Sequence, residues 1–99
     1  MAVFFGDFKN VKGQDIVGKT KLVDKIIKTN GRFFTVLFNT RSNRGLRLMT
    51  CKVNADALEA GLAKNLIPVY DVIKKGYRNI PIEGIIHAVI DNKYIRVKR

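Results

Sequence analysis

The spacing of apolar residues along the chain changes from a helical period to a strand period near Gly31. Before that point, one apolar stripe is formed by Leu22, Val23, Ile26 and Ile27. This spacing predicts an amphipathic helix over residues 19–30. Asn30 and Gly31 favour the end of the helix, because both residues tolerate the left-handed backbone that closes a helix.

After Gly31, apolar and polar residues alternate in short runs, which predicts strands. Residues 32–40 and 46–53 flank a turn-forming segment and are expected to pair as a hairpin. A short helix is expected at 55–63, with Asn54 as its N-cap. The remaining runs predict strands at 66–73, 77–82, 85–90 and 93–97.

The first 18 residues fit neither period. Gly6, Gly13 and Gly18 argue against a long helix there. An edge strand and an arm that orders on a partner are both compatible with this segment. The chain is therefore expected to hold an N-terminal arm and a basic amphipathic helix at 1–30, followed by a barrel at 31–99, in a single domain overall.

The fold class expected from this inventory is mainly β with helical additions, an α+β chain. One substantial helix, one short helix and about five short strands fit a small, strongly bent barrel of the SH3, Sm or OB type. A barrel also avoids the long unpaired edges of a flat sheet. The period-two positions predict one shared core that contains Phe34, Val36, Phe38, Leu48, Val69, Ile85, Val89 and Ile95.

The net charge of the chain indicates which class of partner to expect. The 99 residues include 19 Lys and Arg but only eight Asp and Glu, for a formal net charge of +11. A small body with that charge carries a positive field over much of its surface. Nucleic acid is the first partner to consider for such a domain.

The basic residues form three sets in the sequence, and a solvated surface is the alternative interpretation of each. The helix face carries Lys21, Lys25 and Lys28. The tip of the first hairpin carries Arg41, Arg44 and Arg47. The third set contains Lys74, Lys75 and Arg78, with Arg96, Lys98 and Arg99 near the C-terminus. Arginine forks suit phosphate contact. Tyr70, Tyr77 and Tyr94 could stack on unpaired bases if exposed, although ordinary packing also explains them.

Residues 31–99 resemble the small Sm-like, SH3-like β-barrel proteins of tailed bacteriophages, a group linked by name to the WYL domain. The resemblance rests on the segments Phe34-x-Val36-x-Phe38, Arg47-x-Met49-x-Cys51, Pro68-Val69-Tyr70-Asp71, Gly76-Tyr77-Arg78-Asn79-Ile80 and Asn92-Lys93-Tyr94, with Gly45 and Ile85. Tyr77 stands where an aromatic Trp before Arg would be usual. The resemblance implies a phage origin and a small barrel, and it implies no catalytic activity.

The residues offer little enzymatic chemistry, and we expect no catalytic residues, no cofactor and no metal site. His87 and Cys51 each occur once and lie on expected strands, where packing roles are typical; a nucleophilic pair between them is the alternative. Residues 13–20 match the Walker A pattern, but so short a chain is not expected to supply its large parallel sheet. A weaker version, in which the loop amides and Lys19 hold a backbone phosphate, remains open.

We therefore expect a non-enzymatic phage accessory protein that binds DNA or RNA through phosphate contacts with little sequence readout. The sequence does not separate single from double strands, nor does it give the oligomeric state. One alternative is a host-takeover or anti-defence factor that inhibits a host bacterial protein, and another is a virion component facing packaged DNA. No membrane segment or signal peptide is apparent, so the cytoplasm of the infected host is the expected location.

Overall fold

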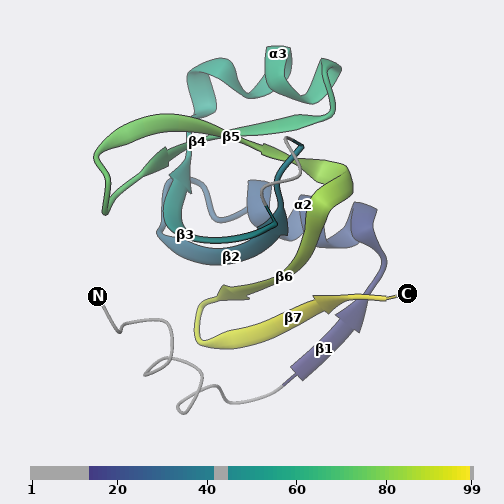
Figure 1. Cartoon of the computed structure of the whole chain (residues 1–99). Helices are drawn as coiled ribbons and strands as arrows, with labels where there is room; N and C mark the ends of the chain where they lie inside the picture. Colours follow the sequence, from purple (N-terminus) through teal and green to yellow (C-terminus); the bar gives the residue numbers. More distant parts are fainter. Residues whose placement is uncertain (1–13, 42–44, 99) are drawn as a thin grey trace.

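One seven-stranded sheet organises the computed structural model, which describes residues 14–41 and 45–98 (Figure 1). The strands are β1 (Gln14–Val17), β2 (Phe34–Asn39), β3 (Leu46–Val53), β4 (Leu66–Asp71), β5 (Gly76–Pro81), β6 (Ile85–Ile90) and β7 (Lys93–Val97). The helical segments are α2 (Lys19–Ile27), η1 (Ala55–Ala57), α3 (Leu58–Ala63) and η2 (Ile82–Gly84).

The order of strands in the sheet is β1-β7-β6-β2-β3-β4-β5. The expectation of a mainly β fold with helical additions is confirmed, but the expected count of about five strands is wrong. The sheet is strongly curved, yet it is not a closed barrel, because within the described residues β1 and β5 remain its two unpaired ends. The additional strand at one end, β1, comes from the segment whose sequence fits no period.

β1 joins the sheet by pairing in parallel with β7, which lies at the other end of the chain. Its register places Gln14 beside Tyr94 and Val17 beside Val97. The Lys98 amide donates a hydrogen bond of 2.6 Å to the Val17 carbonyl. Of the two interpretations of the first 18 residues, the edge strand is therefore correct for 14–17, while 1–13 lie outside the described residues.

The register of β2 on β3 decides which side chains face the core. Val36 lies opposite Met49, and Phe34 lies opposite Cys51, so the odd-numbered residues of β3 turn inward. The prediction that Leu48 belongs to the core is wrong, because this register turns it to the other face, where it is 39% exposed. Both the odd and the even positions of β3 carry apolar residues, so alternation alone does not determine which set faces the core.

The core lies on the concave face of the sheet and is completed by α2. Leu22 and Ile26 of α2 are fully buried and belong to the same cluster as the inward residues of the strands. Six of the eight predicted core residues are in this cluster, namely Phe34, Val36, Phe38, Val69, Ile85 and Ile95. Val89 is buried, but it pairs with Thr35 on the other face and lies outside the cluster, which corrects its assignment.

The ends of the helices follow local backbone chemistry. The Thr29 hydroxyl donates to the Ile26 carbonyl at 2.7 Å, and Asn30 and Gly31 have positive φ values of 50° and 90°, as expected for a helix stop. The predicted helix at 55–63 is divided into η1 and α3. Asn54 occupies the N-cap position without a side-chain capping hydrogen bond within the described part of the chain.

Two substitutions test the facing of the hairpin. Phe38→Ala should lower the free energy of unfolding by about 3–5 kcal/mol, because it removes a ring that is only 2% exposed. Leu48→Ala should cost about 1 kcal/mol or less, since Leu48 lies on the other face and is 39% exposed. Urea denaturation measures both values, and equal costs for the two variants would contradict the observed register.

Candidate nucleic-acid interface

A groove of about 720 Å³ opens where the ends of β2 and β3 meet β5. Its lining residues are Phe38, Thr40, Arg41, Leu46, Arg47, Met49, Leu66, Lys74, Arg78, Asn79 and Pro81. Four of these side chains are cationic, and within the described residues the lining contains no carboxylate. We call this hollow the cationic groove. Its composition suits a polyanion, since its walls attract phosphate without repelling it.

Arg47 reaches the cationic groove because of its place in the hairpin register. It lies opposite Phe38, on the face of β3 that turns toward the core, two residues before the buried Met49. Its side chain is half-buried and lines the groove, which suits a residue with an apolar stem and a charged head. A basic side chain on an inward-facing position is thereby placed at the open end of the concave face.

Lys74 and Arg78 are positioned by the turn between β4 and β5. The buried carboxylate of Asp71 accepts hydrogen bonds of 3.0 Å from the amides of both Ile73 and Lys74, which fixes the start of the turn. Arg78 follows on β5, opposite Val69, and its Nη1 donates to the Tyr77 carbonyl at 2.8 Å. One buried anion therefore shapes the loop that carries the second pair of groove cations.

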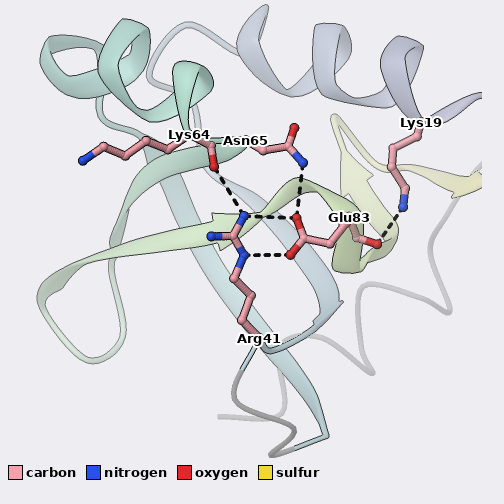
Figure 2. Close-up of polar contacts among 5 residues, drawn as sticks. All are labelled: Lys19, Arg41, Lys64, Asn65 and Glu83. Atoms are coloured by element: carbon pink, nitrogen blue, oxygen red, sulfur yellow. Dashed lines mark hydrogen bonds and ion pairs between the residues drawn. The ribbon is translucent and has the colours of Figure 1, made fainter.

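Arg41 is held by a network at the rim of the groove (Figure 2). Its Nε and Nη2 donate to the two carboxylate oxygens of Glu83 at 2.7 and 3.2 Å, and Nη2 also donates to the Lys64 carbonyl at 3.3 Å. Asn65 donates to Glu83 at 3.3 Å, and the Lys19 ammonium donates to the Glu83 carbonyl at 2.7 Å. The hydrogen bond from Arg41 is the main reason that the pKa of Glu83 falls from 4.5 to about 2.

Gly84 allows this network to form. A Cβ atom at this position would collide with the carbonyl oxygen of Asn39, so only glycine lets η2 approach the end of β2 so closely. That approach brings Glu83 next to Arg41. Arg41 is consequently a fixed part of the groove wall, with its charge largely balanced by Glu83.

The structure brings together residues from two of the three predicted basic sets, and the other predicted residues that it describes lie outside the groove. Arg41 and Arg47 of the hairpin set meet Lys74 and Arg78 of the third set in the cationic groove. Six predicted residues do not line it, namely Lys21, Lys25, Lys28, Lys75, Arg96 and Lys98. Lys28 forms an ion pair of 2.9 Å with Asp24. Arg44 and Arg99 lie outside the described residues.

A second hollow, of about 480 Å³, lies on the outer face of β3, β4 and β5. It is lined by Lys52, Val53, Asn54, Ala55, Asp56, Tyr70 and Tyr77. The rings of Tyr70 and Tyr77 form an edge-to-face pair with centroids 5.1 Å apart, and the Lys52 ammonium lies 5.9 Å from the Tyr70 centroid. We call this hollow the tyrosine hollow. Lys52 belongs to none of the three basic sets predicted from the sequence, although its outward position follows from the alternation of β3.

The positions of Cys51 and His87 do not support a nucleophilic pair. Cys51 faces the core opposite Phe34, whereas His87 lies opposite Leu37 on the other face of the sheet. Burial, reinforced by the charge of Asp71, raises the pKa of the Cys51 thiol, which disfavours the reactive thiolate. Burial lowers the pKa of His87, whose ring packs against Tyr94 at 4.8 Å.

The Walker A match does not form a phosphate-binding loop. Residues 14–17 of the motif are the strand β1, so the stretch that should be a loop is extended. Lys19, the lysine of the pattern, donates instead to the Glu83 carbonyl. The Gly13 position of the match lies outside the described residues.

Comparison of the chain with protein-family models, with curated proteins and with solved structures finds no match in any of the three. Within the described residues, no cluster of His, Cys, Asp or Glu is arranged to hold a metal ion. Within the same ranges, no helix is long and apolar enough to span a membrane. The interpretation of function therefore depends on the geometry of the two hollows.

The network around Glu83 generates a prediction about pH. Because the pKa of Glu83 is lowered on folding, its ion pair stabilises the fold above about pH 4.5, and this stabilisation is lost as the pH falls toward about 2. Wild-type protein should therefore lose more stability across that window than Glu83→Gln. Urea midpoints measured at several pH values test this, and parallel curves for the two proteins would contradict the network.

Proposed function

We propose that this chain is a non-enzymatic nucleic-acid-binding protein that contacts phosphates in the cationic groove with little sequence readout. The observation that carries the proposal is the convergence of four cationic side chains on a hollow whose described lining holds no carboxylate. The net charge of +11 would draw any polyanion toward the surface, and the groove offers it a place to bind.

The ion pairs of the described residues leave three of the four groove cations without a neutralising carboxylate. The carboxylates of Asp15, Asp24, Asp91 and Glu83 are each paired with a cation. Among the described residues, these pairs leave Arg47, Lys74 and Arg78 without a carboxylate partner. The three groove cations are therefore available to phosphate, while Arg41 stays committed to the wall.

Limited sequence readout is part of the proposal because cations, which suit phosphate contact, are the most numerous polar side chains of the lining. Beyond the cations, the polar side chains of the groove are those of Thr40 and Asn79. Phosphate contacts position a protein on nucleic acid but carry no base information, which comes from groups that reach base edges.

The proposal includes a phage origin, an SH3- or Sm-like relationship and a location in the cytoplasm of the infected host, all supported by the resemblance of residues 31–99.

A specific observation favours the alternative function, in which the protein binds and inhibits a host bacterial protein. Leu46 and Leu48 project from one face of β3 and are 60% and 39% exposed, and Leu37 lies beside Leu48. Exposed apolar side chains that share a face are typical of protein contacts. In this alternative, the surrounding cations would meet acidic groups of the partner.

Single substitutions of the groove cations test the proposed function. Arg47→Ala, Lys74→Ala and Arg78→Ala should each weaken binding to any nucleic-acid sequence and reduce the salt slope of the affinity by about one unit. Fluorescence anisotropy with labelled oligonucleotides across a salt series measures both quantities. Lys21→Ala is the matched control, since Lys21 is exposed but does not line the groove.

Two outcomes would contradict the proposal. In the first, a variant that combines Arg47→Ala, Lys74→Ala and Arg78→Ala keeps the wild-type affinity and salt slope, so the groove is not the binding site. In the second, the wild type binds no nucleic acid even at low salt. If Leu48→Lys then abolished co-purification of a host protein, the alternative function would replace the proposed one.

A further inference from the structure

We infer that the protein prefers single-stranded nucleic acid, with a base stacked on Tyr77 in the tyrosine hollow and the neighbouring phosphates in the cationic groove. This inference rests on the proposed function and specifies its ligand. It is carried by an aromatic side chain that is unusually open. Tyr77 is 69% exposed, the largest exposure among the large apolar and aromatic residues of the described chain.

Tyr77 is held in place although it is exposed. Its ring forms the edge-to-face pair with Tyr70, which is half-buried and lies directly opposite on β4. Such pairs attract each other in a preferred orientation, beyond the area they bury. The pair therefore orients the Tyr77 ring, and little further ordering is required when a flat ligand stacks on it.

The other residues of the tyrosine hollow suit a base better than a phosphate. The carboxylate of Asp56 lines the hollow and would repel a phosphate group. Asn54, in the same lining, offers both a donor and an acceptor to the edge of a base. Lys52 lies near the Tyr70 ring and could meet a phosphate at the rim.

The two hollows are joined by the edge strand β5. Tyr77 and Arg78 are consecutive, so their side chains point to opposite faces of the sheet, one into each hollow. β5 is the last strand in the sheet order, so a flexible chain can cross it there. A duplex is too stiff to bend across a single β-strand from one hollow to the other, and it keeps its bases paired. A single strand can bend and present an unpaired base.

The test compares oligothymidylate with an abasic oligomer of the same length, about 12 nucleotides. Both carry the same phosphates, but only the first offers bases. Wild-type protein should bind the oligothymidylate more tightly. Tyr77→Ala should weaken that binding by roughly 5- to 150-fold, the equivalent of about 1–3 kcal/mol for one stacked base, and leave the abasic oligomer unaffected. Tyr77→Phe keeps the ring and should bind as the wild type does.

Three further arms separate the possible outcomes. Ile73→Ala is the control for an exposed side chain on the same hairpin, since Ile73 is 50% exposed and lines neither hollow. Arg78→Ala should weaken binding of both oligomers equally, because it removes a phosphate contact. Oligouridylate in place of oligothymidylate shows whether RNA or DNA is preferred. A loss of affinity in Tyr77→Ala for either oligomer supports the inference.

The results distinguish the inference from the proposed function. If Tyr77→Ala binds oligothymidylate as tightly as the wild type while Arg78→Ala binds both oligomers weakly, the stacking site is wrong and the phosphate groove stands. If the wild type binds neither oligomer nor a duplex at low salt, the proposed function fails and the inference fails with it. Urea denaturation of Tyr77→Ala shows whether any loss of oligomer affinity is caused by a loss of stability.

Discussion

The register of the β2–β3 hairpin is the constraint on which the rest of the structure depends. It turns Met49 and Cys51 toward the core and places Arg47 at the end of that same inward row. A slip by one residue would exchange the two faces, exposing Met49 and drawing a charged side chain out of the groove. Core packing and the position of a functional cation therefore follow from a single alignment of two strands.

Two carboxylates complete the groove by fixing the chain rather than by facing a ligand. Asp71 is buried and accepts amide hydrogen bonds that shape the turn before β5. Glu83 holds Arg41 through two hydrogen bonds, and Gly84 lets it come near enough to do so. In a chain with so few acidic residues, both are used to organise the cationic surface.

The sequence predicted the local elements more fully than their arrangement. The bounds of β3 and the helix stop at Asn30 follow from apolar spacing and backbone preference, which act over a few residues. The pairing of β1 with β7 joins segments about 80 residues apart, so no local sequence pattern predicts it. Likewise, Arg47 and Arg78 belong to different basic sets in the sequence, and only the curvature of the sheet brings them to one groove. For Tyr77 the sequence left stacking and packing both open, and its position on the outer face of β5 leaves it exposed.

The most direct test of the account is an NMR titration of the isotopically labelled protein with a short oligonucleotide. If the cationic groove is the binding surface, the amide signals of Arg47, Lys74 and Arg78 and their neighbours should shift together, and they should return as salt is added. The exposed face of α2 around Lys21 should remain unchanged. Shifts confined to α2 and β7, with the groove signals unmoved, would contradict the account.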